Sequence, residues 1–316
     1  MTRRVRSWAV AALAVLAAKT LPENNRLPLN WFVMAPGFLR QSLVLVVLAT
    51  GLIGSAATAA PFSSIGTLVV ERVGNGSLTL SSTATQISVL EITTSGSLTQ
   101  TITLASGTTN PQTDTGSGTS DGYLNTYGGY VSVPGYNAAA GTAGVASSNA
   151  KVNSLLDTSG NVVTRTLFPT GGANGTPPSP FSNNYYRSSI ATSGSTFYGV
   201  GQSTGSPNTG GAWYVSGTTF TQVSGTATGQ PTNLRVAEIY NNQLYATSAA
   251  SAGYGIFSIG SGLPTTAGNP SSLVINTGTG SAYGFVMFST GAHGSGVLDL
   301  AYIADDRTTV GGGLEK

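Results

Sequence analysis

The sequence predicts an all-β fold, and three features point to it. After Pro61 the apolar residues alternate or gather in short runs, which Ser, Gly, Thr and Asn separate. The 43 glycines are about twice the usual share of roughly 7%, and charged residues make up only 8% of the chain. After Ala60, no stretch longer than one turn has the pattern of an amphipathic helix. Together these features favour strands joined by tight turns.

Five tight hairpins are expected after Pro61. In each, two runs of strand-forming residues flank adjacent residues that include Gly or Asn, which tolerate the positive φ of tight hairpins. The expected turns lie at Ser95–Gly96, Ser159–Gly160, Ser193–Gly194, Ser216–Gly217 and Asn241–Asn242. The Ala-rich stretch 137–152 is interrupted by two glycines, so we expect a loop there.

A repeat relates "YRSSIATSGSTFYGVG" to "LRVAEIYNNQLYATS". Arg187 and Arg235 hold equivalent places in the two copies, and each opens a strand-like run. A third, looser copy ends in "LDLAYIADD", where Tyr302 follows Tyr245 at a somewhat longer interval. A period of about 40–50 residues with several strands per unit is typical of propeller blades, and the two arginines fit it. Residues 60–316 are therefore expected to form a single β-propeller-like domain of about five such units.

Two other architectures remain as alternatives. A right-handed β-helix also favours Gly, Ser, Thr and Asn, but its rungs would repeat every ~20 residues and need few tight hairpins. A β-sandwich of two sheets is the third alternative. The five expected hairpins favour the propeller-like fold over the β-helix.

Residues 34–59 have the order of a secretory signal peptide. One cation, Arg40, precedes the apolar run 42–54, and small residues follow it. Ala57 and Ala59 satisfy the small-x-small rule, so cleavage is expected before Ala60. A membrane anchor would need about 20 strongly apolar residues, so no stable membrane span is expected after cleavage. The signal peptide predicts a secreted, extracellular protein.

Residues 1–33 form a second basic and apolar leader, to which we assign no domain. Either translation begins at Met34, or the first leader is an additional targeting element. We favour the start at Met34.

Charge is unevenly distributed along the chain, whose formal net charge is +2. Six of the 13 Lys and Arg residues precede Ala60, but only Glu23 among the 11 Asp and Glu residues does. Residues 60–316 therefore carry seven cations and ten carboxylates, a net charge of −3. Without a basic patch to neutralise phosphates, no nucleic acid is expected as a partner. The chain has no cysteine, which excludes disulfides and thiolate metal sites.

Arg187 and Arg235 are candidate ligand-binding residues, because a radial fold would bring them to the same level of successive blades. One interpretation is an anion-binding ring; the other, which we favour, is that each arginine joins neighbouring blades by hydrogen bonds to backbone carbonyls. Trp213 is a further candidate, since its indole can stack on a sugar ring, although aromatic residues on strands are mostly core.

Asp305 and Asp306 are the obvious carboxylate pair for glycoside hydrolysis. Adjacent strand residues point to opposite faces, so these two are not expected to flank one bond. With Asp299 they are weak candidates for calcium ligands, although the spacing matches no recognised calcium loop. We favour turn and cap hydrogen bonds for all three, and calcium is the only cofactor considered.

Few other residues are candidates for catalysis, metal binding or modification. His293 is the single histidine and lies among Gly and Ser, so neither a catalytic triad nor a zinc site is expected. No catalytic residue is therefore assigned. Asn75 and Asn174 begin "NGS" and "NGT", which are N-glycosylation acceptors if the host glycosylates secreted proteins.

Several segments resemble, in order, a family of large secreted proteins that look like β-propellers and have no established activity. They are "GTLVVERVG", "GGYVSVPGYN", "NYYRSSIATSGSTFYG", "NLRVAEIYNNQLYATS", "FSIGSGLPTT" and "AYIADDRTTVGGGLEK". The resemblance covers nearly all of 62–316 and implies an extracellular propeller-like body without a catalytic residue to transfer. In that family further strands follow the last segment, so we expect this chain to lack its final blade or blades, or its recorded end to be artificial.

These observations predict a secreted, non-catalytic binding or surface protein whose partner is an extracellular glycan or protein. A carbohydrate-binding module is the most specific version of this prediction. The alternative is an extracellular polysaccharide lyase or hydrolase on a propeller scaffold, which would act through Asp305, Asp306 or tyrosines in a central channel.

Overall fold

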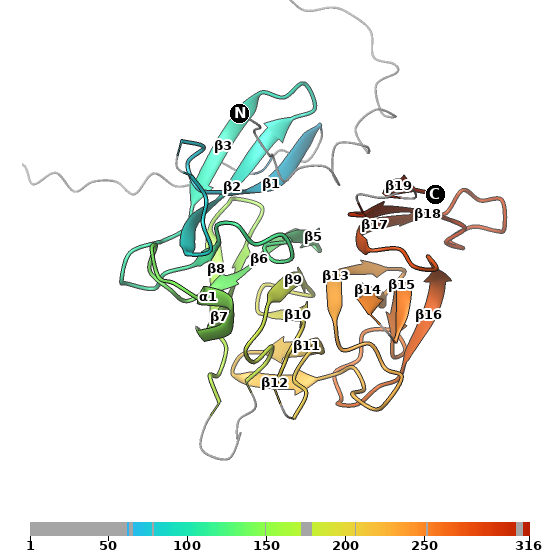
Figure 1. Ribbon diagram of the computed structural model, residues 1–316. Coiled ribbons are helices and arrows are strands. Elements are labelled where there is room, and N and C mark those ends of the chain that lie inside the picture. Colours follow the sequence, from blue (N-terminus) through green and yellow to red (C-terminus); the bar gives the residue numbers. More distant parts are fainter. Residues whose placement is uncertain are drawn as a thin grey trace, which may run out of the picture.

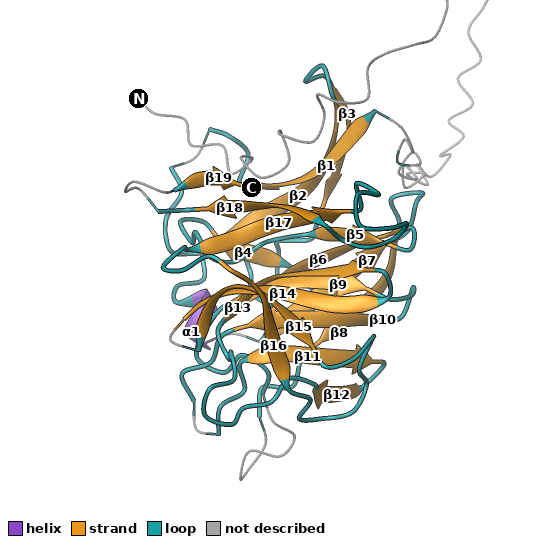
Figure 2. Ribbon diagram, turned by 90° about the vertical axis from the view of Figure 1, so that its right-hand side faces the viewer, coloured by secondary structure: helices purple, strands orange, loops and turns teal. Residues whose placement is uncertain are grey.

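The computed structural model describes residues 62, 66–77, 79–148, 150–171, 179–205, 207–250, 252–307 and 312–316. The leader 1–33, the signal peptide 34–59 and its cleavage site lie outside the described residues, as does Asn174. The described part is all-β, as the sequence predicts. It contains strands β1 to β19 and one helical turn, α1 (Val145–Ser148), which Figure 2 shows in purple beside the strands.

The first sheet is the largest and contains eight strands. Its main order is β1-β2-β4-β6-β7-β8, with β3 paired to β2 and β5 paired to β6. All of these pairs are antiparallel. The strands are β1 (Thr67–Val73), β2 (Ala84–Thr93), β3 (Leu98–Thr103), β4 (Thr113–Thr115), β5 (Asn125–Tyr127), β6 (Tyr130–Tyr136), β7 (Lys151–Leu156) and β8 (Val162–Leu167).

Three smaller antiparallel sheets follow, each built from strands consecutive in the chain. Their orders are β12-β11-β10-β9, β13-β14-β15-β16 and β17-β18-β19. The strands of the second sheet are β9 (Tyr186–Ala191), β10 (Thr196–Gly201), β11 (Gly211–Ser216) and β12 (Thr219–Gln222). Those of the third are β13 (Leu234–Tyr240), β14 (Gln243–Ala250), β15 (Gly253–Ile259) and β16 (Ser271–Asn276). Those of the fourth are β17 (Ala282–Phe288), β18 (Leu300–Asp305) and β19 (Gly313–Glu315).

All five expected hairpins are present. They join β2 to β3, β7 to β8, β9 to β10, β11 to β12 and β13 to β14. Asn241 and Asn242 both have positive φ, 48° and 59°, so their turn has the left-handed backbone that a two-residue hairpin needs. In the stretch 137–152, where a loop is expected, the described residues form the single helical turn α1, and β7 begins at Lys151.

The predicted repeat corresponds to successive sheets. Arg187 is the second residue of β9 and Arg235 is the second residue of β13, so each lies in the first strand of its sheet. Tyr245 and Tyr302 lie in the second strands, β14 and β18. Figure 1 shows the sheets following one another in chain order around a common centre, with β5, β9, β13 and β17 on the inside.

Apolar side chains between neighbouring sheets form the core. One cluster joins the second and third sheets through residues such as Ile190, Val200 and Leu244, all fully buried. Another joins the first and second sheets through Leu155, Phe168 and Trp213. Smaller clusters pack the third sheet on the fourth and fill the first sheet. Each sheet is thus held face to face with the next.

A polar tie crosses the inner strands. The side-chain nitrogen of Asn125, in β5, lies within hydrogen-bond distance of Ser188 Oγ (2.8 Å), the Ser189 carbonyl (3.1 Å) and the Ala237 carbonyl (2.9 Å). Ser188 and Ser189 belong to β9, and Ala237 belongs to β13. One buried amide therefore connects three consecutive sheets.

Candidate functional site

The inner strands bring several of the candidate residues together. Tyr283 is the second residue of β17, so it occupies the position that Arg187 and Arg235 occupy in β9 and β13. Tyr123 lies just before β5 and forms a parallel bridge with Ser188. The Arg235 guanidinium lies over the Tyr283 ring at 4.0 Å from its centroid, and the Tyr123 and Tyr283 ring centroids are 5.5 Å apart. We call Tyr123, Arg187, Arg235, Tyr283 and Asp306 the inner cluster.

Arg187 is a buried cation, with only 5% of its surface exposed. Its Nη2 donates to Gln202 Oε1 at 2.8 Å, whereas Nε and Nη1 have no hydrogen-bond partner among the described residues. Burial lowers the pKa of its guanidinium, and the nearby charge of Arg235 acts in the same direction. The predicted hydrogen bonds from this arginine to backbone carbonyls are not seen among the described residues; its acceptor is the side-chain amide of Gln202.

Arg235 connects the cluster to the surface. Its Nη1 donates to Ser281 Oγ at 2.7 Å and lies 3.9 Å from Asp306 Oδ1. The exposed fractions of the two side chains are 12% for Arg235 and 51% for Asp306. An ion pair this long, with one partner half in water, contributes little to stability. The Arg235 side chain is therefore mostly buried but keeps some contact with solvent.

Asp305 has different side-chain partners from Asp306, although Ser281 contacts both Asp305 and Arg235. Its side chain is fully buried, accepts a hydrogen bond from the Ser281 N–H at 2.9 Å, and pairs with Arg307 Nη2 at 2.8 Å. Arg307 also pairs with Glu315 at 2.7 Å. Burial alone would raise the pKa of Asp305, but the hydrogen bonds and charge of Arg307 outweigh it and lower that pKa. We call Asp305, Arg307 and Glu315 the Arg307 network.

The remaining predicted residues lie apart from the inner cluster. Asp299 accepts hydrogen bonds from Thr290 N (2.6 Å) and Oγ1 (2.7 Å), which lower its pKa to about 2, and its Oδ2 lies 3.4 Å from His293 Nδ1. Among the described residues, no group of three His, Cys, Asp or Glu side chains is placed to hold a metal ion. Asp299, Asp305 and Asp306 are therefore not brought together.

Trp213 and Asn75 have contrasting environments. Trp213 is 1% exposed, and its Nε1 donates to the Thr209 carbonyl at 2.9 Å, so its ring has no free face for a sugar. Asn75 is exposed in a turn, where its Oδ1 accepts a hydrogen bond from Ser77 N at 2.9 Å. Asn75 is therefore sterically open to modification.

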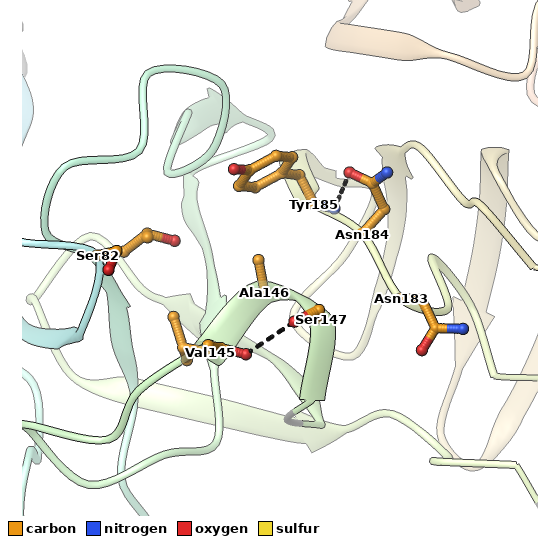
Figure 3. Close-up of a pocket in the computed structure, with 9 residues that line it drawn as sticks. Ser82, Val145, Ala146, Ser147, Asn183, Asn184 and Tyr185 are labelled. Atoms are coloured by element: carbon orange, nitrogen blue, oxygen red, sulfur yellow. Dashed lines mark hydrogen bonds between the residues drawn. The ribbon is translucent and has the colours of Figure 1, made fainter.

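A pocket lies beside the start of β9, between the first and second sheets (Figure 3). Its volume is about 290 Å³, and it opens to solvent on one side. None of the lining side chains is charged. They are Ser82, Thr115, Gly144, Val145, Ala146, Ser147, Asn183, Asn184 and Tyr185.

The chain 181–185 shapes one wall of this pocket. Phe181 and Asn183 have positive φ, 58° and 55°, which is uncommon for residues with a side chain and is found most often where surrounding contacts enforce it. Phe181 is held by stacking on Tyr186, with ring centroids 5.1 Å apart and planes 8° apart. Asn184 Oδ1 accepts a hydrogen bond from Tyr185 N at 2.9 Å, which leaves the Asn184 amide nitrogen to donate elsewhere.

This pocket could not be predicted from the sequence because its walls come from distant segments. Residues 82, 115, 144–147 and 183–185 meet only in the folded chain. A second depression, of about 280 Å³, lies between β16 and β18 and includes Asp299 and Glu315. Those two carboxylates already have the partners described above.

Comparisons with known proteins add little to the description of this site. No protein-family model matches the chain, and no curated protein matches it. A mutant of the Synechocystis apocarotenoid oxygenase has a similar solved structure, with a TM-score of 0.39 and 10% sequence identity. The match covers 78% of this chain and 54% of that chain, so our chain spans about half of the oxygenase. A likeness of this size carries no inference about activity.

One further property concerns membranes. None of the helical structure in the described residues has the length and apolar character needed to cross a bilayer.

Proposed function

We propose that this chain is a secreted, non-catalytic binding protein, and that it binds an extracellular glycan in the pocket beside β9. The observation that carries the proposal is the lining of that pocket, where side-chain amides, hydroxyls and a tyrosine surround an uncharged depression. Secretion rests on the signal peptide read from residues 34–59.

A neutral sugar matches this lining in three ways. Sugar hydroxyls both donate and accept hydrogen bonds, as do the amides of Asn183 and Asn184. The partly exposed ring of Tyr185 offers an apolar face with a polar tip, which suits the C–H face of a sugar. The volume of about 290 Å³ lies just below the roughly 300–1,000 Å³ of pockets for drug-sized ligands, so the pocket suits a small ligand such as one sugar unit.

We also propose that the sheets are blades of a propeller-like body. Two observations support this: the second and third sheets are four-stranded meanders, and their first strands lie side by side on the inside. The spacing of Arg187 and Arg235, which is one blade length, supports the same arrangement.

The alternative of a lyase or hydrolase receives no specific support from the carboxylates. Asp305 is bound to Arg307 and to the Ser281 N–H, so its lone pairs are engaged. Asp306 is half exposed and faces Arg235. The two carboxylates therefore do not flank a common space where a glycosidic bond could lie.

A glycan array probed with the secreted protein tests the proposal. We expect binding to neutral glycans, and we expect Tyr185→Ala to weaken it at least about tenfold, a loss of roughly 1.4 kcal/mol. Tyr254→Ala is the matched control, because Tyr254 is a similarly half-buried tyrosine on β15, away from the pocket. Silence across plant, bacterial and algal glycans, or equal loss in both variants, would refute the proposal.

A further inference from the structure

We propose that the inner cluster is a second binding site, which takes an oxyanion: the carboxylate or sulfate group of an acidic glycan. Arg235 would contact the anion, and Arg187 would supply positive charge beneath it. This inference goes beyond the neutral pocket, because the two sites use different residues and different chemistry.

The first support is a buried cation that is not part of an ion pair. Arg187 and Arg235 are close enough for their charges to interact, and Arg187 forms no ion pair within the described part of the chain. The carboxylate that faces Arg235 is Asp306, at 3.9 Å. Burying a cation outside an ion pair costs free energy, and a bound oxyanion would offset that cost.

The second support is the preorganised geometry of Arg235. The Tyr283 ring packs against one face of the Arg235 guanidinium, and Ser281 Oγ accepts a hydrogen bond from Arg235 Nη1. A guanidinium fixed in one plane loses little further freedom when it binds, and its fork of N–H donors matches the oxygens of a carboxylate or sulfate. Its partial exposure gives the anion a route of approach.

Neighbouring carboxylates decide from which side the anion arrives. Glu71 and Asp114, on the first sheet, approach Gly122, the residue before Tyr123. Their charges would repel an anion on that side. On the side of Arg235, Asp306 is half exposed and weakly paired, so its carboxylate lies where a ligand would compete with it.

Thermal unfolding of the full chain at constant ionic strength tests the site with three probes: glucuronate, sulfate and glucose. An anion that binds only the native state raises the unfolding midpoint. We expect glucuronate or sulfate to raise it by several degrees and glucose to leave this site unaffected. Glucuronate alone would identify a carboxylate site, and sulfate alone would identify a sulfate site. No shift with either anion would overturn the proposal.

Two variants should act in opposite directions. Arg235→Gln should abolish the anion-induced shift, because it removes the contacting guanidinium. Asp306→Asn should strengthen anion binding about threefold or more, because it removes the competing carboxylate. Arg165→Gln is the matched control, since Arg165 is also partly buried with an unpartnered Nε but donates from Nη2 to Pro111 and Asn137. An equal shift in Arg235→Gln and the wild type would show a general salt effect and refute the site.

Arg187→Gln separates a ligand role from a structural one. If the Arg187 charge is stabilised only by a bound anion, its replacement by a neutral amide should raise the unfolding midpoint measured without anion. The same replacement should remove the increase in midpoint that the anion causes in the wild type. A lower midpoint without anion would assign Arg187 to structure alone and overturn its role here. The anion-induced shift should persist in Tyr185→Ala, so failure of the glycan pocket and failure of this site are distinguishable.

Discussion

Arg187 and Arg307 are both held against other sheet residues, yet their surroundings are opposite. Arg307 is the more exposed, at 23% of its side chain, and pairs with two carboxylates, Asp305 and Glu315. Arg187 is the more deeply buried and pairs with none within the described residues. If both arginines served structure alone, the deeper one would need the partners more. This contrast is why we assign the Arg307 network to fold stability and propose the inner cluster as a ligand site.

Breaking the Arg307 network at its buried centre should have the largest effect. Asp305→Ala leaves the Ser281 N–H and the Arg307 guanidinium without their acceptor, so we expect the thermal midpoint to fall by about 5–10 °C. Calorimetry measures this change. Asp306→Asn is the control, because Asp306 is half exposed, and it should shift the midpoint by less than about 2 °C. Equal losses would mean that Asp305 has no special structural role.

Acid should reveal the same network through its pH dependence. The pKa of Asp305 is lowered in the folded protein, so its contribution is present above the unfolded value, about 4, and disappears as the pH falls through the folded pKa. Asp299 acts in the same direction, with a folded pKa of about 2. We expect the thermal midpoint to fall between about pH 4 and pH 2, and to fall less in Asp305→Asn. An unchanged slope in that variant would contradict this account.

The smallest effect is expected at the exposed end of the network. Glu315→Gln removes one partner of Arg307 but leaves Asp305 in place. A partly exposed ion pair contributes little, so the midpoint should fall by about 1–2 °C. The comparison with Asp305→Ala, measured in the same buffer, sharpens the difference between the two carboxylates. A loss as large as that of Asp305→Ala would show that the two pairs act as one unit.

The fold class and the turns were predictable because they depend on local chemistry. Asn241 and Asn242 can adopt left-handed backbone within their own dipeptide, and alternating side chains mark the strands on either side. The equivalence of Arg187 and Arg235 was also predictable, because residues at the same position of a sequence repeat occupy the same position in each structural unit. The arrangement of the sheets was less accessible, since it depends on which faces pack together.

The candidate site was predictable only in part. Tyr283 follows Arg235 at the same interval that separates Arg235 from Arg187, so the repeat did contain the signal for it. Aligning the third copy on Tyr302 hides this signal, because the interval from Tyr245 to Tyr302 is longer than the other two. Tyr123 follows no such spacing, and it reaches the cluster through its bridge to Ser188. Trp213 was a candidate for stacking on a sugar, although aromatic residues on strands are mostly core, and its ring does lie in the core.

The tie made by Asn125 has a consequence for how the molecule opens. The Asn125 amide of β5 donates hydrogen bonds to both β9 and β13. Separating one of these three strands from the others therefore leaves buried polar groups without hydrogen-bond partners. Local openings that involve the inner strands should therefore be shared and not confined to one sheet. In hydrogen exchange, the amides of β9 and β13 would then report a single cooperative unit with a common opening free energy.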